Sequence, residues 1–307
     1  MIKPQVSVII PVYNQEKYLA ECLESVLEQK GASFEIIAIN DGSTDRSGEI
    51  LKRYQRHIIL IEQENQGPAS ARNQGIKRAQ AELIAFLDAD DRYLPDHLAQ
   101  LVNFIKTKNA LLFYGDVRVI DEKGNFLWVQ KSPSEIELQD LLIKNQICAS
   151  SVAVRREVFE QELYFKNLHP VEDWELWIRI RELGEFSQYN WVGVEYRKHQ
   201  TSAIKSKIID AEEKSLFVLE DAFKRHQELS RWLKRKALSS LYYQSLLRFL
   251  ASEDIKGARK RALLSLRYYP FWISAWLGLG LTLIPQNLLK RFINLRREFK
   301  KWKNQSK

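Results

Sequence analysis

Three carboxylates stand close together directly after an apolar run. Asp88, Asp90 and Asp91 follow the apolar residues 83–87 in the segment LIAFLDADD. Crowded carboxylates repel one another, and each is costly to bury without a partner. Oxygen ligands of this kind hold Mg²⁺ or Mn²⁺, and such an ion would cancel the repulsion and bind a substrate's diphosphate. We also expect Asp91 to cap the helix that begins near Pro95.

Two more polar segments follow strand-like patterns earlier in the chain. Pro11 and Tyr13 end the first pattern in IIPVYN, and Asp41 follows the second in NDGSTD. Either loop alone is explained by an ordinary strand-to-helix turn with glycine and helix-capping residues. Together, two adjacent strand ends would form a cleft sized for a nucleotide base. In that cleft Asp41 would be free to accept a hydrogen bond from a base N–H.

An arginine, Arg72, falls in the helix predicted over residues 68–79. A guanidinium binds phosphate, or clamps a carboxylate with two parallel hydrogen bonds. A solvated surface arginine would explain Arg72 equally well, so its meaning depends on what lies next to it in the fold.

These residues need a scaffold, and the first 107 residues alternate strand and helix patterns. The expected strands cover residues 6–12, 34–39, 58–61 and 83–87, and the expected helices cover residues 18–29, 45–55, 68–79 and 95–107. Strand–helix–strand units of this kind build a mostly parallel sheet. Ligands of such sheets bind at the carboxyl ends of the strands, which is where the acidic and polar loops lie.

The pattern changes after residue 108. Residues 110–121 and 124–130 flank the turn DEKG and predict an antiparallel hairpin. A strand over 147–154, a helix over 174–183 that begins at Asp173, and a strand over 186–196 follow. Residues 206–267 have a continuous helical pattern, so we expect a domain boundary after residue 205.

The motifs PVYN, NDGSTD, ARNQG and FLDADD, in this order and spacing, resemble those of the inverting family 2 glycosyltransferases of the GT-A fold. The resemblance covers about the first 205 residues. It implies a Rossmann-like mixed α/β sheet flanked by helices, followed by a helical C-terminal region. It also implies a nucleotide-sugar donor, usually UDP-linked, bound by Pro11, Tyr13, Asp41, Arg72, Asp88, Ala89 and Asp90. Asp90 would in addition ligate Mn²⁺ or Mg²⁺.

The same resemblance implies a catalytic base in the second half of this region. Glu172 and Asp173, in HPVEDWELWIRI, match the family's Glu-Asp pair. Asp173 would deprotonate the acceptor hydroxyl as it attacks the anomeric carbon from the face opposite the leaving diphosphate; its alternative role is a helix N-cap. YRKHQTSAI resembles the family's closing Tyr-Arg-x-His element, in which His199 would reach the diphosphate or the metal. The Gly-Ser that often follows this element is absent.

One partial match favours a single transfer for each acceptor. QELSRW, at residues 227–232, has one residue too many for the Gln-x-x-Arg-Trp motif of processive polysaccharide synthases. The sequence also has no apolar stretch long enough to cross a membrane, as a secretion channel would require. We therefore expect a non-processive enzyme.

Composition and cysteine use indicate the compartment. The chain has 307 residues, enough to bury a substantial core. Its two cysteines, Cys22 and Cys148, are far apart in sequence and form no Cys-x-x-Cys pair, which predicts a reducing, cytoplasmic environment. The N-terminus has no small-residue cleavage site and reads as a first strand, not as a signal peptide.

The C-terminal part predicts contact with a membrane surface. Residues 271–284 carry no charge but are too few to span a bilayer, so a core hairpin or an interfacial segment is expected. Residues 286–307 contribute +7 of the net charge of +8, which leaves about +1 for the rest of the chain. A basic amphipathic helix of the kind that lies on anionic lipid is indicated by Leu288, Phe292, Leu295, Phe299 and Trp302. A terminal helix docked on its own domain is the alternative.

The sequence thus predicts inverting, metal-dependent transfer of a hexosyl group from a nucleoside diphosphate. The expected acceptor is a hydroxyl of a glycan or lipid-linked molecule in cell-envelope polysaccharide biosynthesis, at the inner face of the membrane. A sugar nucleotidyltransferase is one alternative, although PVYNQEKYL lacks the glycine-rich phosphate loop such an enzyme needs. A non-catalytic binder with a decayed site is another, although every expected acid is present. Nucleic acid is not expected as a partner, because the apolar stripe of the tail fits lipid better.

Overall fold

The computed structural model of the chain describes residues 3–199 and 205–284. The chain divides into two compact units, residues 1–141 with 145–199, and residues 142–144 with 200–307. The sequence predicted a division after residue 205; in the structure the first unit ends at His199.

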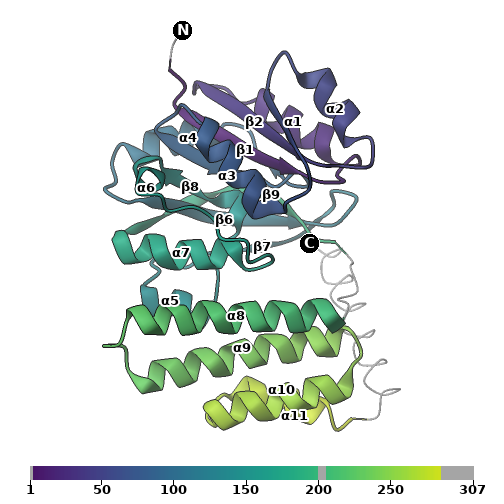
Figure 1. Cartoon of the computed structure of the whole chain (residues 1–307), viewed down its shortest axis with the longest axis vertical. Coiled ribbons are helices and arrows are strands. Elements are labelled where there is room, and N and C mark those ends of the chain that lie inside the picture. The colour runs from purple at the N-terminus through teal and green to yellow at the C-terminus, as the bar shows by residue number, and fades with distance from the viewer. Residues whose placement is uncertain (1–2, 200–204, 285–307) are drawn as a thin grey trace. The chain divides into compact units, whose positions relative to one another are not determined.

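The first unit is built on one mixed sheet of nine strands (Figure 1). The strand order is β3-β2-β1-β4-β8-β6-β9-β5, and β7 pairs with β6 outside this path. The first four strands are parallel, whereas β8 joins β4 antiparallel. The strands are β1 (Val6–Val12), β2 (Phe34–Asp41), β3 (Ile59–Gln63), β4 (Leu83–Phe86), β5 (Arg92–Tyr93), β6 (Leu112–Ile120), β7 (Phe126–Gln130), β8 (Ala153–Arg155) and β9 (Phe186–Arg197).

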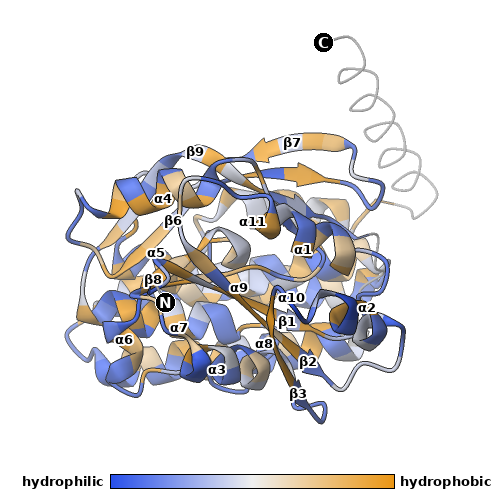
Figure 2. Cartoon of the chain, turned by 90° about the horizontal axis from the view of Figure 1, so that it is seen from above, coloured by the Kyte–Doolittle hydropathy of each residue, from blue (hydrophilic) through white to orange (hydrophobic). Residues whose placement is uncertain are grey.

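Helices cover this sheet because its central strands are apolar on both faces. β1 and β2 are coloured as hydrophobic along most of their length in Figure 2, and a parallel strand of this kind needs cover on each side. The helices that begin in this unit are α1 (Leu19–Leu27), α2 (Ser47–Tyr54), α3 (Pro68–Arg78), α4 (His97–Ile105), α5 (Leu138–Ile143), α6 (Glu157–Glu160) and α7 (Glu172–Leu183), with a 3₁₀ turn at Ala149–Ser151.

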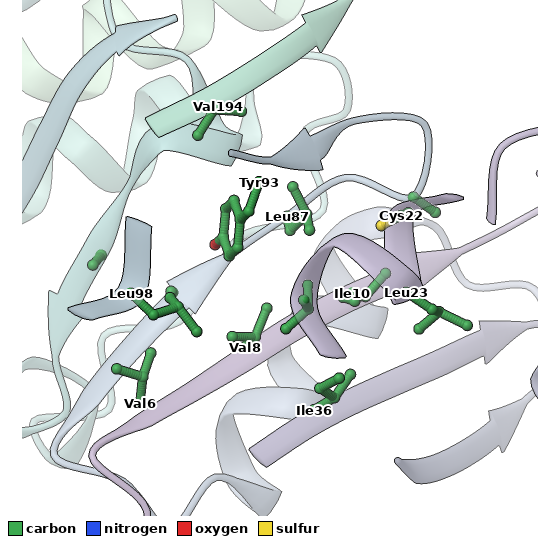
Figure 3. Close-up of a cluster of buried hydrophobic side chains, with 14 of the residues drawn as sticks. Val6, Val8, Ile10, Cys22, Leu23, Ile36, Leu87, Tyr93, Leu98 and Val194 are labelled. Atoms are coloured by element: carbon green, nitrogen blue, oxygen red, sulfur yellow. The ribbon is translucent and has the colours of Figure 1, made fainter. Parts of the chain in front are cut away.

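The main core lies between the sheet and α1. Val8 and Ile10 of β1 point toward Leu23 of α1 and Ile36 of β2, with Leu87 close by (Figure 3). On the other face, α3 approaches the sheet closely because residue 75 is glycine. A Cβ at Gly75 would lie 2.6 Å from Ile9 Cγ2. This close approach fixes the depth at which α3 presents its polar residues.

The second unit is a set of helices in which α9 packs against α8, α10 and α11. A small apolar core includes Phe249 of α9 and Ala258 of α10. The helices are α8 (Lys205–Arg225), α9 (Arg231–Ala251), α10 (Ile255–Tyr268) and α11 (Ile273–Leu281). Among the described residues, no helix combines the length and the apolar character that crossing a bilayer requires.

Most expected elements are confirmed, whereas one expected strand and one expected hairpin are wrong. Residues 147–154 are not one strand, because only Ala153–Arg155 is extended and a 3₁₀ turn precedes it. The helical pattern predicted over residues 206–267 is confirmed, with two breaks that the sequence did not indicate; Ser230 and Asp254 cap α9 and α10 by accepting hydrogen bonds from Leu233 N and Gly257 N. Within residues 271–284, Ile273–Leu281 form a helix, so the hairpin alternative is excluded. The tail from residue 286 lies outside the described residues.

Candidate active site

The loops after β1 and β2 are joined to each other. Asn14 Oδ1 accepts a hydrogen bond from Thr44 N at 2.8 Å, and Ser43 Oγ donates to Val12 O at 3.4 Å. Tyr13 stands on this joint loop with 46% of its surface exposed. The two strand ends therefore form one surface that exposes an aromatic ring, on which a flat ring system could stack.

Asp41, at the end of β2, is buried and already hydrogen-bonded. Its Oδ1 accepts from Gln63 Nε2 at 2.6 Å and from Gln66 N at 2.8 Å, and its Oδ2 accepts from Gly67 N at 2.9 Å. Asp41 thus has a structural role that the sequence did not indicate, because its carboxylate fixes the loop that leads into α3. A carboxylate has about four acceptor positions, so one remains for a ligand. Nucleoside binding by Asp41 stays a prediction.

Arg72 of α3 is buried and joins two distant parts of the chain. Its Nη2 lies 2.7 Å from Asp88 Oδ1, and its Nη1 lies 3.0 Å from Glu172 Oε1. Burial alone would lower the pKa of Arg72, but the charges of Asp88 and Glu172 raise it above the usual arginine value. Arg72 is therefore no surface arginine. It links the acidic loop after β4 to the first turn of α7, where Glu172 lies 100 positions after Arg72.

The two acids at the start of α7 have opposite environments. Burial would raise the pKa of Glu172, but the hydrogen bond with His169 and the charge of Arg72 hold it at about 2. Burial, followed by the charge of Glu172, raises the pKa of Asp173 to about 6. Asp173 Oδ2 accepts from Asn145 Nδ2 at 3.1 Å, and its Oδ1 accepts from Trp174 N at 2.7 Å. Near neutral pH, Asp173 is the acid of this pair with a pKa suited to proton transfer.

Asp90 faces His199, with 2.7 Å between Asp90 Oδ2 and His199 Nε2. Burial and the charge of Asp88 raise the pKa of Asp90, against the hydrogen bond from His199. Within the described ranges, no group of three or more His, Cys, Asp and Glu side chains is placed to hold a metal. Mg²⁺ is often held by only one or two carboxylates, with substrate phosphates as further ligands. Asp90 and His199 fit such a partial site.

Asp91 does not cap a helix, so that expectation is wrong. Its side chain is buried and accepts from Ser150 Oγ at 2.5 Å and from Arg197 N at 2.7 Å. The helix α4 begins at His97 without a side-chain cap. Burial, together with the charges of Asp90 and Asp88, raises the pKa of Asp91 well above its usual value. Asp91 therefore anchors the acidic loop to β9.

Two residues that sequence reasoning gave no role support the site. Arg197 Nε donates to Asp90 O at 2.8 Å, and its Nη2 lies 2.6 Å from Glu21 Oε2. The Tyr-Arg-x-His element pointed to this arginine without indicating its partners. Asn145, which holds Asp173, had no signal in the sequence, because it lies in an irregular segment between two elements.

Comparison with known proteins identifies the family. The family model described as glycosyl transferase family 2 matches residues 7–163. The chain belongs to this family. The matched region ends before α7, so Glu172, Asp173 and His199 lie beyond it.

Relatives of this family 2 chain include TuaG of Bacillus subtilis, a glycosyltransferase named for teichuronic acid biosynthesis. It is 31% identical over 238 residues, which cover 75% of this chain and 93% of TuaG. An uncharacterized glycosyltransferase of Rickettsia bellii is 36% identical over 180 residues, 57% of this chain but only 26% of that protein. One of Haemophilus influenzae is 37% identical over 161 residues, 51% of this chain and 64% of that protein. The matches thus span less than two thirds of these last two relatives.

Solved structures confirm the GT-A type of fold for this family 2 chain. TarS of S. aureus, residues 1–349 with UDP-GlcNAc, has a TM-score of 0.58 at 19% identity, over 86% of this chain and 91% of that one. The mannosyltransferase PcManGT of Pyrobaculum calidifontis, with GDP-Man and Mn²⁺, has a TM-score of 0.52 at 15% identity, over 92% and 88%. At these identities the likeness concerns the fold alone.

Proposed function

We propose that the protein is an inverting, metal-dependent hexosyltransferase that uses a nucleoside diphosphate sugar, with UDP as the nucleotide. Its acceptor is a hydroxyl of a glycan or lipid-linked molecule in cell-envelope polysaccharide biosynthesis. It acts in the cytoplasm, as a peripheral protein at the inner face of the membrane. The family supports glycosyl transfer, and the name of TuaG supports a cell-envelope product.

The observation that carries the proposal is the pairing of Arg72 with both Asp88 and Glu172. Through it, the acidic loop that would receive the donor and the helix that carries Asp173 share one buried cation. A donor held at that loop and an acceptor at Asp173 would lie on either side of one reaction centre. A protein that only binds a sugar nucleotide has no need of Asp173.

Asp173 takes the proton in the proposed reaction. The acceptor hydroxyl oxygen forms a bond to the anomeric carbon while the bond from that carbon to the diphosphate oxygen breaks, which inverts the configuration. The hydroxyl proton passes to Asp173, and the nucleoside diphosphate leaves. Asp173 suits this role because its pKa of about 6 leaves it ionised at pH 7 and still basic. Glu172, with a pKa of about 2, orients Arg72 instead.

Asp90 and His199 would hold Mn²⁺ or Mg²⁺, and Asp88 would stay with Arg72. When bound, the ion supplies positive charge that offsets the charge on the leaving diphosphate. Arg72 fixes one Asp88 oxygen, and Arg197 holds the Asp90 backbone, so the loop is ordered by protein contacts alone. Tyr13 and Asp41 would bind the nucleoside, with Pro11 and Ala89 lining its site. UDP is favoured by the motif resemblance; a fold neighbour with UDP-GlcNAc and one with GDP-Man make both nucleotides worth testing.

Calorimetric titration tests the donor site without knowledge of the acceptor. UDP and GDP are titrated with and without Mn²⁺ into the wild type, Asp90→Ala, and the control Glu135→Gln, which changes an exposed acid. We expect Mn²⁺ to strengthen the binding of UDP to the wild type and to Glu135→Gln. Mn²⁺ should have no effect on the binding of UDP to Asp90→Ala. Binding that ignores Mn²⁺ and Asp90, or no binding of either nucleotide, would refute the proposal. Asp173→Asn should bind UDP as the wild type does.

A further inference from the structure

Helix α11 of the second unit exposes an apolar face. Phe271 and Ile273 are 80% and 74% exposed, Leu277 and Leu283 are each 67% exposed, and Trp276 is 55% exposed. Monomeric soluble proteins rarely expose large apolar side chains next to one another in this way. The face therefore needs a covering partner.

Close packing of the opposite side of α11 holds the apolar face toward the solvent. The opposite side of α11 carries the small buried residues Ala275, Gly278 and Thr282. A Cβ at Gly278 would lie 2.4 Å from Leu246 Cδ2 of α9, so no larger residue fits there. Arg259 of α10 donates to Thr282 O at 2.6 Å and holds the end of the helix. Rotation of α11 to bury its large residues would disrupt this packing and the Arg259 hydrogen bond.

Aromatic side chains border the face. The ring centroids of Trp232 and Tyr269 are 5.8 Å apart, and those of Tyr269 and Phe271 are 5.9 Å apart. Trp276 Nε1 donates to Pro270 O at 2.8 Å. Tryptophan and tyrosine gather where one end of a ring meets hydrocarbon and the other meets water.

The helices behind this face are strongly basic. Residues 231–284 hold ten Lys and Arg against two Asp and Glu, whereas residues 1–230 hold 29 against 36. The charge of about +1 predicted for the chain before its tail is therefore a balance between an acidic first part and basic helices. α10 itself has five basic residues and no acid, and Lys256, Lys260 and Arg267 are exposed on it. Arg259, which is also exposed, joins α10 to the C-terminal end of α11 by donating to Thr282 O.

The positive charge of these helices indicates which partner covers the apolar face. The tail, at +7, and a second copy of the same basic helices would both bring like charge against it. Nucleic acid would satisfy the charge but would leave leucine and isoleucine unburied. An anionic bilayer satisfies both requirements, because acyl chains receive the apolar side chains while headgroups receive the lysines and arginines.

We propose that α11 lies in the plane of an anionic phospholipid bilayer surface, with its apolar face in the headgroup–acyl boundary and the basic side of α10 against the headgroups. The inference deepens the peripheral location given above and would explain access to a lipid-linked acceptor. It names the described surface, not the tail, as the necessary contact.

Vesicle sedimentation of the full chain tests the surface. The wild type should bind vesicles of mixed phosphatidylglycerol and phosphatidylcholine, and bind phosphatidylcholine alone far more weakly. Ile273→Asn with Leu277→Asn should weaken binding about 100-fold, from the loss of two buried aliphatic side chains. Lys256→Gln with Lys260→Gln should weaken it about 20-fold. The matched controls, Phe126→Asn and Lys106→Gln with Lys108→Gln, should bind as the wild type does.

A fluorescent label tests the same contact in a protein that still binds vesicles. An environment-sensitive fluorophore on Leu277→Cys should shift to the blue with anionic vesicles, whereas the same label on Phe126→Cys should not. Wild-type binding by the α11 variant, or an unshifted label at 277, would overturn the proposal in favour of the tail. Conversion of a dimer to a monomer by the α11 variant, without vesicle binding by the wild type, would overturn it in favour of self-association. UDP titration of the same variants reports the donor site separately, so either proposal can fail alone.

Discussion

The two carboxylates at the start of α7 allow one substitution to be predicted in detail. Asp173→Asn removes the ionisable group that the fold holds at a pKa of about 6, compared with the ordinary 3.8. At about 1.4 kcal/mol for each pKa unit, the ionised Asp173 costs the folded state about 3 kcal/mol. This cost is absent below pH 3.8, where the group is protonated in both states, and complete above pH 6.

The substitution also loses a contact. Asparagine retains one acceptor oxygen, which serves Trp174 N or Asn145 Nδ2 but not both. A lost hydrogen bond costs about 1 kcal/mol. The variant should therefore be about 2 kcal/mol more stable than the wild type at pH 8, and about 0.5 kcal/mol less stable at pH 4, where about 0.5 kcal/mol of the ionisation cost remains.

Urea denaturation across this pH range measures the difference without an acceptor. The midpoints of Asp173→Asn and the wild type should cross at about pH 4.5, where the ionisation cost equals the lost contact. Glu135→Gln, at an exposed acid, should follow the wild type throughout. Stability curves that run parallel from pH 4 to pH 8 would refute the raised pKa and the argument that Asp173 is the base. Once an acceptor is known, Asp173→Asn should lower kcat at least about 100-fold.

Three further outcomes follow from single contacts. Arg72→Ala leaves two carboxylates without their buried cation and should lower the free energy of unfolding by about 3–5 kcal/mol, measured by urea denaturation. The wild type should gain UDP affinity on addition of Mn²⁺, and Asp90→Ala should bind UDP equally with and without the metal in calorimetry. Gly115→Ala should destabilise by about 3 kcal/mol, because its Cβ would meet the Tyr189 ring at 1.8 Å. Gly280→Ala, where nothing lies within 4 Å, is the control and should not lower the unfolding midpoint.

The placement of the loops was predictable because strand periodicity and sheet topology decide it locally. Val6–Val12 and Phe34–Asp41 are recognisable from apolar runs, and parallel strands put their following loops at one edge. The pairing of Arg72 with Glu172 was not predictable, because no pattern within either segment indicates a partner 100 positions away.

Asp41 shows a second limit of the sequence. Its contacts were not foreseen, because its partners are two backbone N–H groups of the loop before α3 and the side chain of Gln63 at the end of β3. Every residue except proline has a backbone N–H, so residue types do not indicate which N–H groups donate to Asp41. The helix breaks near residues 226–230 and 252–254 were missed for a different reason. Ser230 and Asp254 are caps, but each also occurs inside helices, and the apolar period continues past them.

The pairing of Glu21 with Arg197 spans 176 positions. A ribosome adds about 5–20 residues each second, so Arg197 is synthesised roughly 10 to 35 seconds after Glu21 of α1. Until then the acidic loop has neither Arg197 nor His199 beside it, and β6 lacks the complete β9 along one edge. A nascent or truncated chain that ends before residue 199 should therefore be inactive toward donor and prone to aggregate through its open sheet. Donor binding would then serve as a readout of completed synthesis of the first unit.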